Sequence, residues 1–307
     1  MIATTNVSNI LWLGDRACDD PARVGGKSAH LSRLSADYQV PSGFCLTAAA
    51  FDPDHSADAP LPTALAAALT AAYEALARRV GCPDVPVAVR SSALDEDGDL
   101  ASFAGQHETE LNLVGVDDVL GAVVRCWASG RNERALAYRK QQGLNTEEVR
   151  LAVLVQQLVM VDTSAVVFSA NPISGNRDEV VVTASWGLGE SVVSGTVTPD
   201  TWVVRKADLA VKEERIGAKE RMTVAVTGGT REVTVPRLLR ERASLSRAQV
   251  TELATLAMEL EVKMNRSVDI ETAYAREELF LLQCRPITTL DEIGATPEAD
   301  VSATVSD

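Results

Sequence analysis

The sequence predicts an α+β protein with two lobes. Its 307 residues are enough for two parts that each have a hydrophobic core. Strand patterns and helix patterns follow one another without the strict alternation of a doubly wound sheet. The clearest strand pair is Ser267–Arg285, where apolar and polar residues alternate on both sides of a charged turn. We expect an N-terminal lobe in 1–150, a C-terminal lobe in 151–290 and an acidic, disordered tail in 291–307.

The composition narrows the classes of partner and the cellular compartment. A net charge of −14 argues against binding to nucleic acid or anionic membrane, because both need a basic surface. The N-terminus has no signal-peptide pattern and no apolar run is long enough to span a membrane, so we expect a cytoplasmic protein. The five cysteines are scattered and form no CxxC pair, which favours reduced thiols over disulfides or a zinc site.

The N-terminal half is expected to alternate strands and helices. Asn9–Leu13 is a short candidate strand, and a helical pattern at Ala29–Leu34 follows the Gly25-Gly26-Lys27-Ser28 segment. Leu65–Arg79 is an Ala-rich helix whose two arginines lie at the C-terminal end, where the helix dipole favours cations. The further elements expected here are strands at Val85–Ser91 and Thr109–Val114, an acidic turn at Asp95–Gly98, and a helix over Asp117–Gln142 interrupted near Gly130.

The C-terminal half is expected to be rich in strands. Its short β patterns, separated by Gly, Pro and Asn turns, are Leu151–Val159, Ala165–Ala170, Val180–Ala184 and Thr201–Arg205. Ser246–Arg266 is the clearest helix, because Ser246 and Gln249 form a capping box ahead of an apolar stripe that ends with Val262 and Met264. This helix leads directly into the strand pair at Ser267–Arg285.

The polar positions of that strand pair have the chemistry of a metal and phosphate site. Opposed residues in an antiparallel hairpin share a constant index sum, so Glu271 opposite Gln283 requires a loop of odd length. Arg276–Glu278 is a three-residue candidate. The same register pairs Asp269 with Arg285. Carboxylate and amide oxygens suit Mg²⁺ and a guanidinium suits phosphate, whereas ordinary cross-strand pairs on a solvated face are the alternative interpretation.

Two glycine-rich segments do not match the standard nucleotide signatures. Gly25-Gly26-Lys27-Ser28 has Pro21 where a P-loop needs its first glycine. Gly187-Leu188-Gly189-Glu190 has Val192 where the dinucleotide fingerprint needs its third glycine. The glycine pair before Lys27 nevertheless allows backbone and lysine to approach an anion at a helix start, with a plain helix N-terminus as the alternative.

Two further segments suit phosphate. Arg90 ends an apolar strand, where an arginine serves either as a structural partner of a carboxylate or as a phosphate clamp. Residues 101–109 are small and flanked by hydroxyls, which allows backbone N–H groups to face phosphate oxygens.

Eight motifs in a fixed order give the chain a resemblance to a known family. They are GGKSAHLSRL, VPSGF, VRSSALDEDGDLASFAGQHETELN, CWAS with RALAYR, VQQLV, FSANPISGNRDEVVVTASWGLGESVVSG, DIE and LLQCRPIT. In this order they resemble the nucleotide-binding domain of the phosphoenolpyruvate synthase, pyruvate phosphate dikinase and rifampin phosphotransferase family. The resemblance extends over nearly everything outside the two ends and implies an ATP-grasp fold, in which two α+β lobes hold ATP between them.

The resemblance also implies a role for each matching residue on the phosphate side of the site. Lys27 and Arg90 would hold phosphates, and Gly105 and Thr109 would lie in the loop that covers them. One position departs from the family pattern, because His107 stands where glutamine is common.

On the adenine and metal side, the resemblance implies a hinge strand and a metal pair. The hinge strand along the adenine would be VQQLV, with Leu158 where methionine is usual, and its contact residues would be Gln156, Gln157 and Val159. Glu271 and Gln283 would coordinate Mg²⁺, with Asp269 as a neighbouring carboxylate. Arg285 would reach the β- and γ-phosphates.

The reaction implied by the resemblance is that of a dikinase. ATP with Mg²⁺ would pyrophosphorylate a histidine on a swivelling domain and leave AMP, while Lys27, Arg90 and Arg285 offset the charge on the transferred group. The family's Gly/Thr/Ser-His motif is missing from this sequence, so the histidine is expected on a separate domain or partner protein. The three histidines present are His30, His55 and His107.

Two other functions stay open at this point. A freestanding ATP-grasp ligase would activate a carboxylate as an acyl phosphate, join it to an amine and release ADP. A non-catalytic module would bind nucleotide without turnover, although a complete set of phosphate and metal residues argues against that. The nucleotide product separates the dikinase, which leaves AMP, from the ligase, which leaves ADP.

Overall fold

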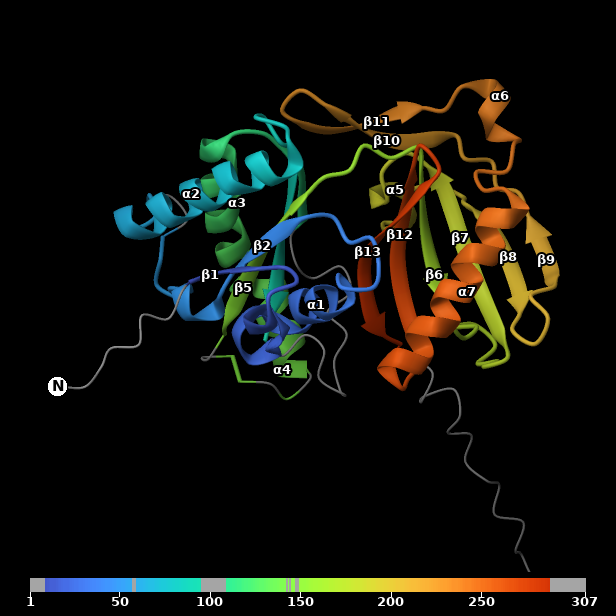
Figure 1. Cartoon of the computed structure of the whole chain (residues 1–307), viewed down its shortest axis with the longest axis horizontal. Coiled ribbons are helices and arrows are strands. Elements are labelled where there is room, and N and C mark those ends of the chain that lie inside the picture. The colour runs from blue at the N-terminus through green and yellow to red at the C-terminus, as the bar shows by residue number, and fades with distance from the viewer. Residues whose placement is uncertain are drawn as a thin grey trace, which may run out of the picture.

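The chain folds into two lobes, each built on an antiparallel sheet (Figure 1). The structure is a computed structural model, and it describes residues 9–56, 59–94, 109–141, 143, 145–146 and 149–287. Both lobes mix helices with strands, which confirms the predicted α+β class. Within these described ranges, no helix is long and apolar enough to cross a membrane.

The first sheet has five strands in the order β1-β2-β5-β3-β4. Their bounds are β1 Ile10–Trp12, β2 Gly43–Leu46, β3 Val87–Ala93, β4 Thr109–Leu113 and β5 Leu151–Gln157. We expected β5 in the C-terminal lobe, but it pairs with β2 and β3 in the middle of this sheet. The connection to the second sheet therefore begins after Gln157, while a division of the chain at residue 150 stays a prediction.

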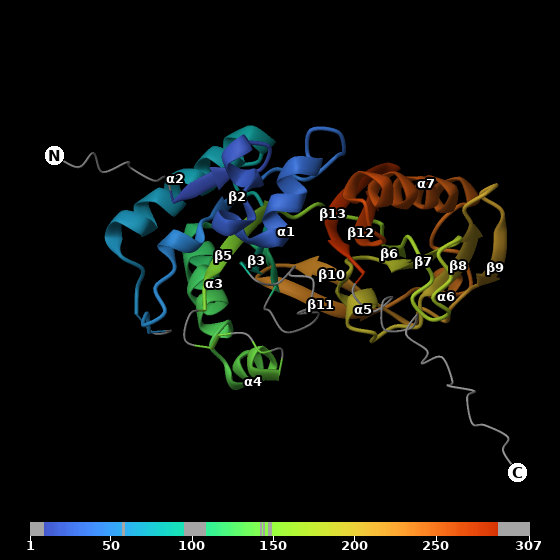
Figure 2. The ribbon, with the colours of Figure 1, turned by 90° about the horizontal axis from the view of Figure 1, so that it is seen from below.

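Helices cover both faces of the first sheet (Figure 2). Their bounds are α1 Pro21–Leu34, α2 Thr63–Val80, α3 Val116–Ser129 and α4 Glu133–Gln141, with short 3₁₀ turns at Arg16–Asp19 and Ala48–Ala50. Val87 and Val89 of β3 pack into a core with α2 and α3. Helix α1 lies on the opposite face, against β3 and β5. Its Leu31 and Leu34 also join the core of the second lobe, so α1 contacts both lobes.

Helix α1 is broken at Gly25, two residues before Lys27. Gly25 has φ 74° and ψ 161°, a conformation that favours glycine. A Cβ atom there would lie 2.3 Å from Ser92 Oγ and 2.6 Å from Ser92 O of β3. We expected the helix to start after the glycine pair, whereas it starts at Pro21, where Asp20 caps it through the Ala22 N–H. The break allows α1 to lie directly on the end of β3.

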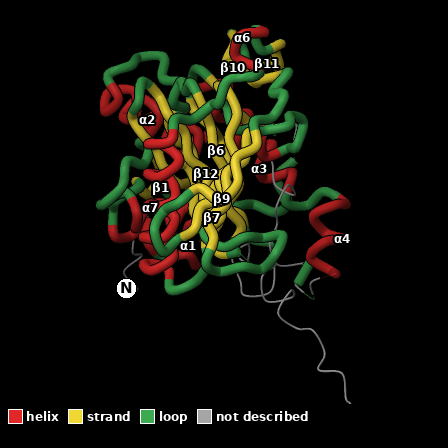
Figure 3. The backbone as a smooth tube through the Cα atoms, turned by 90° about the vertical axis from the view of Figure 1, so that its right-hand side faces the viewer, coloured by secondary structure: helices red, strands yellow, loops and turns green. Residues whose placement is uncertain are grey.

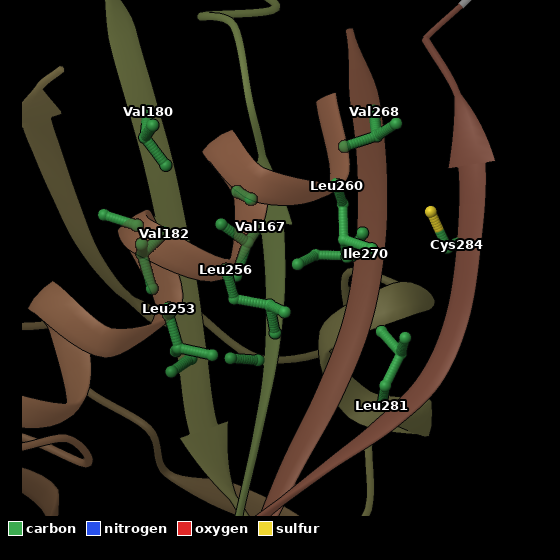
Figure 4. Packing of buried hydrophobic residues seen from close by; sticks show 14 of the residues in the cluster. Val167, Val180, Val182, Leu253, Leu256, Leu260, Val268, Ile270, Leu281 and Cys284 are labelled. Carbon is green, nitrogen blue, oxygen red and sulfur yellow. The ribbon is translucent and has the colours of Figure 1, made fainter. Parts of the chain in front are cut away.

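The second sheet has six strands in the order β13-β12-β6-β7-β8-β9. Their bounds are β6 Thr163–Phe168, β7 Glu179–Trp186, β8 Asp200–Arg205, β9 Val211–Arg215, β12 Val268–Ala275 and β13 Glu278–Pro286. Helix α7, Arg247–Met264, packs on this sheet, and its predicted capping box of Ser246 and Gln249 is present. Figure 4 shows Leu253, Leu256 and Leu260 of α7 over the strands β6, β7 and β12. Val262 was expected in the stripe but is 81% exposed.

A third, two-stranded sheet reaches from the second lobe to the first (Figure 1) and lies at the upper edge of the molecule in Figure 3. It consists of β10, Arg221–Val226, and β11, Gly229–Thr234, and we call it the strap. Near its tip, Asn112 Nδ2 of β4 donates to Val226 O and to Gly229 O, each at 2.7 Å. Near its base, the fully buried Lys219 Nζ lies 2.5 Å from Asp200 Oδ1. The strap thus joins the two lobes at one end of the molecule.

The remaining expectations divide into three groups. The predicted strands and helices correspond to elements of the structure, including the interruption of the 117–142 helix near Gly130, and all five cysteines are free. The elements we did not predict are β2, β9, the strap, α5 Glu190–Val193 and α6 Arg237–Arg240. The expected turn at 95–98 and the tail at 291–307 lie outside the described residues.

Candidate functional site

A pocket lies where the two lobes meet. Strands β3, β4 and β5 line it from the first lobe, and β6, β12 and β13 line it from the second. The segment that joins the two sheets, 158–161, forms part of its wall. Most of the predicted site residues come together here, namely Arg90, Thr109, Gln156, Gln157, Val159, Glu271 and Gln283. A pocket between two α+β lobes is the arrangement of the predicted ATP-grasp fold.

One wall of the pocket is apolar. It is formed by the joining segment and the start of α5, with side chains from Leu158, Val159, Val161, Leu188, Val192 and Val193. Gln156 lines the same region, but its Nε2 donates to Pro41 O at 3.1 Å, so its amide is already part of the fold. An apolar wall that faces a few polar groups is typical of a small-molecule site and fits a flat aromatic base.

The β12–β13 hairpin brings its polar residues together in the predicted register. Glu271 lies opposite Gln283, and Asp269 lies opposite Arg285. The predicted three-residue loop is wrong, because the turn consists of Arg276 and Glu277 alone, with φ 49° and 71°. Two left-handed residues make a two-residue hairpin turn of the primed type.

A β-bulge restores the register after this short turn. Thr272 is opposite Leu281, whereas Glu271 is opposite Gln283, so Leu282 is an extra residue without a partner on β12. One extra residue is indeed needed for Glu271 to stand opposite Gln283, but we expected it in the loop. The structure places it inside β13, next to the pocket, where bulges are common in proteins.

Arg90 is the cation of the pocket that comes from the first lobe. It shares a face of β3 with Ala88 and stands directly opposite Thr109 of β4. Its Nη1 donates to Leu282 O at 3.1 Å, across the junction between the lobes. Its Nε is buried and has no hydrogen-bond partner among the described residues. A buried charged donor without a partner is costly, so an anionic ligand fits this position.

The hairpin supplies oxygen ligands for a cation. Asp269 accepts from Arg285 Nε at 2.8 Å, and its other oxygen is buried without a partner among the described residues. Burial raises the pKa of Asp269, and the Arg285 guanidinium opposes that rise. No group of three His, Cys, Asp or Glu gathers as a metal site in the described part of the chain. The oxygens of Glu271 and Gln283 therefore suit a cation that takes its other ligands from a bound molecule, as Mg²⁺ does with phosphates.

Lys27 and Arg285 are not among the residues that line the pocket. Lys27 Nζ donates to Ser91 O at 3.2 Å, next to Arg90 along β3. Arg285 is held by Asp269, two residues beyond Gln283 on β13. Gly105 and His107 lie outside the described residues.

Glu190 and the start of α5 line the pocket, and the sequence argument missed them. The signal was present in the glycines before Glu190. Gly187 has φ 79°, and a Cβ there would lie 2.4 Å from Thr223 O of the strap. The segment does not match the dinucleotide fingerprint, and Gly187 serves a close packing of the backbone instead.

Known proteins resemble the chain over most of its length. Residues 54–304 match the family described as "Pyruvate phosphate dikinase, AMP/ATP-binding domain". A probable phosphoenolpyruvate synthase from Methanocaldococcus jannaschii is 38% identical over 317 residues, which cover 92% of this chain and 27% of the relative. The phosphoenolpyruvate synthase of Pyrococcus furiosus is 43% identical over 249 residues, with 78% and 30% covered. A rifampicin phosphotransferase from Streptomyces sviceus is 36% identical over 322 residues, with 93% and 36% covered. The chain thus spans between 27% and 36% of the length of these three relatives.

Proposed function

Because the chain belongs to the pyruvate phosphate dikinase AMP/ATP-binding domain family, we propose that it is the ATP-cleaving part of a dikinase. With Mg²⁺, it transfers the β,γ-pyrophosphoryl group of ATP to a histidine on a separate swivelling domain or partner, and AMP is the nucleotide product. Its relatives are much longer than this chain, which supports a division of the reaction between domains. Neither of the two histidines in the described ranges, His30 and His55, lines the pocket.

The observation that carries this proposal is the buried Nε of Arg90, which has no hydrogen-bond partner in the part of the chain that the structure describes. It lies in a pocket that the Glu271–Gln283 pair also lines. An anion-binding donor and a cation-binding pair in one pocket are the two requirements of a metal-bound polyphosphate.

On the phosphate side, we assign Arg90 and Lys27 to the phosphates of ATP, with Gly105 and Thr109 in the loop that covers them. Thr109 stands opposite Arg90 and lines the pocket, which supports its place beside the phosphates. Arg285 is assigned to the β- and γ-phosphates. Its guanidinium is shared with Asp269, so it contributes less free charge than Arg90 does.

On the adenine side, we assign the joining segment and the end of β5. The backbone of Gln156, Gln157 and Val159 would run along the base. The apolar wall around Val159 supports this, because an aromatic ring buried there leaves little polar surface unmatched. The same segment connects the two sheets, so the base would lie at the hinge between the lobes.

On the metal side, we assign Glu271 and Gln283 to Mg²⁺, with Asp269 as a nearby carboxylate. Mg²⁺ would neutralise charge on the phosphates during transfer. The residues of this chain orient the phosphate chain through Arg90 and keep water from the base through the apolar wall.

Nucleotide product analysis by ³¹P NMR tests this function. The chain is incubated with Mg·ATP, alone and with a candidate partner protein that carries a swivelling histidine domain. We expect AMP to form in stoichiometric amounts only when the domain is present. Glu271→Ala should abolish this turnover while ATP binding persists. Glu74→Ala, which removes an exposed partner of Arg78 on α2, is the matched control and should keep it.

Three outcomes would contradict the proposal. AMP formed by the chain with a small-molecule acceptor would remove the need for a partner. ADP formed with a carboxylate and an amine would favour the ligase chemistry. Nucleotide binding without turnover under any of these conditions would favour a binding module.

A further inference from the structure

The bulge residue Leu282 stands between the two halves of the pocket. We propose that its backbone carbonyl is the positioning group that aims Arg90 at the phosphates of the bound nucleotide. This inference rests on the proposed function and adds to it a residue that no chemical signature marks, because the acting group is a main-chain oxygen. Leu282 lines the pocket, and its oxygen accepts from Arg90 Nη1 at 3.1 Å.

The register explains why an oxygen is available at this place. From the two-residue turn up to Thr272, opposed residues follow one index sum. If that register continued, Leu282 would stand opposite Glu271, and Gln283 would move to the other face. The bulge removes Leu282 from the pairing with β12, which keeps Gln283 opposite Glu271. One inserted residue thus sets the metal pair and supplies the acceptor for Arg90.

Two N–H donors of Arg90, at Nη1 and Nε, differ in their hydrogen bonding. A guanidinium carries five N–H donors in a rigid fork. Nη1 is engaged by Leu282 O, while the buried Nε has no partner among the described residues. Holding one arm of the fork restricts the rotamers of a long side chain before the ligand arrives, which lowers the entropy lost on binding.

The acceptor of Arg90 is uncharged, which distinguishes it from the acceptor of Arg285. Arg285 is also held in place, but by the carboxylate of Asp269, which offsets its charge. The Leu282 carbonyl is neutral, so Arg90 is oriented and still keeps its full positive charge for an anion. Among these two arginines, the structure assigns Arg90 the stronger phosphate contact.

Deletion of Leu282 tests the inference. The deletion gives the whole hairpin a single index sum, with Glu271 still opposite Gln283 and Leu281 still opposite Thr272, so the fold should persist. We expect ATP to bind about tenfold more weakly, because a hydrogen bond to a charged group is lost. Adenosine has no phosphate, and its affinity should stay unchanged. The readout is the ratio of ATP to adenosine affinity, measured by calorimetry.

Leu282→Ala is the matched variant, because it removes the side chain and keeps the carbonyl. Any fall of the ATP-to-adenosine ratio in Leu282→Ala measures the side chain alone, and the ratio should fall about tenfold further in the deletion, which also removes the carbonyl. A wild-type ratio in the deletion would overturn the inference. Arg90→Gln separates this failure from that of the proposed function, since wild-type ATP affinity in Arg90→Gln would remove Arg90 from the phosphate site altogether.

If circular dichroism shows that the deletion variant does not fold, a measurement on the wild-type chain tests the inference instead. Side-chain ¹⁵N NMR of Arg90, assigned by the signal missing in Arg90→Lys, reports rotation of the guanidinium. We expect slow rotation both without nucleotide and with ATP, and an ATP-induced shift at Nε. Free rotation in the absence of nucleotide would overturn the inference.

Discussion

Arg90 and Asn112 stand on neighbouring strands of the first lobe, and each donates to backbone carbonyls of the second. Asn112 uses its amide for two acceptors in the strap, Val226 O and Gly229 O. Arg90 uses Nη1 for Leu282 O, and its buried Nε has no partner among the residues that the structure describes. The donors of the Asn112 amide are used within the protein, whereas Arg90 keeps a buried donor that suits an anion. We therefore propose that similar geometry across one junction serves structure at Asn112 and ligand binding at Arg90.

The base of the strap, like Asn112, is held by polar contacts within the protein. Asp200 accepts from Lys219 Nζ, and its second oxygen accepts from Ser244 N and Ser244 Oγ, each at 2.7 Å. Gly217 N also donates to Asp200, at 2.8 Å. A buried pair with its oxygens fully satisfied holds backbone in place and has no free group for a ligand.

The largest effect of a substitution is expected at the base of the strap, on the free energy of unfolding. Lys219→Met leaves the Asp200 carboxylate buried without its cation, which should lower the free energy of unfolding by about 3–5 kcal/mol. Urea denaturation followed by circular dichroism measures the loss. The double variant Lys219→Met/Asp200→Asn should recover part of it, since no charge is then left unpaired. A loss below about 1 kcal/mol in the single variant would show that the strap does not depend on this pair.

The second-largest effect is expected at Glu271 and Gln283, the proposed Mg²⁺ ligands, on the Mg²⁺ requirement of ATP binding. Glu271→Gln keeps an oxygen but removes the negative charge, so half-saturation of ATP binding by Mg²⁺ should require at least about tenfold more metal. Calorimetric ATP titrations at stepped Mg²⁺ concentrations measure this. ATP affinity without metal should be unchanged or higher. An unaltered Mg²⁺ requirement would contradict the assignment of Glu271.

At Asn112, hydrogen bonding and backbone strain are separable. Asn112 has φ 60°, so Asn112→Gly loses the two hydrogen bonds but keeps the backbone conformation. We expect it to lower the free energy of unfolding by about 1–2 kcal/mol. Asn112→Ala adds the strain of a left-handed residue, roughly 1–2 kcal/mol more. Equal losses in both variants would contradict the role of the backbone conformation.

The smallest of these effects concerns the shape of the cation at position 90. Arg90→Lys retains the charge but replaces the fork by one ammonium, which cannot hold Leu282 O and a phosphate in the same way. ATP affinity should fall about tenfold by calorimetry, with little change in thermal stability. Arg78→Lys on α2, an exposed position, is the control. Wild-type ATP affinity in Arg90→Lys would mean that charge alone matters.

Much of the fold and site followed from the sequence where the local signal was strong. The α7 capping box and the register of Glu271 with Gln283 were both read correctly, because each depends on spacing within one or two adjacent elements. The bulge at Leu282 was not predictable from parity, since an extra residue satisfies it equally well in the turn or in the strand.

Other features depended on distant contacts. Strands β9 and β11 are polar and largely exposed, so they carry little hydrophobic periodicity. The Gly25 break results from the approach of α1 to Ser92, sixty-seven residues further along the chain. The placement of β5 in the first sheet is set by pairing with β2 and β3, which a single strand pattern does not specify.

The comparison between Arg90 and Asn112 is tested most directly by one calorimetric series with Mg·ATP. Wild type, Arg90→Gln and Asn112→Gly are titrated at a temperature at which all three are folded. We predict that Arg90→Gln lowers ATP affinity by roughly tenfold to a hundredfold, because a charged donor is lost from the pocket. Asn112→Gly should stay within about threefold of the wild type, because its effect falls on stability. Equal losses in the two variants, or wild-type affinity in Arg90→Gln, would contradict this account of the junction between the lobes.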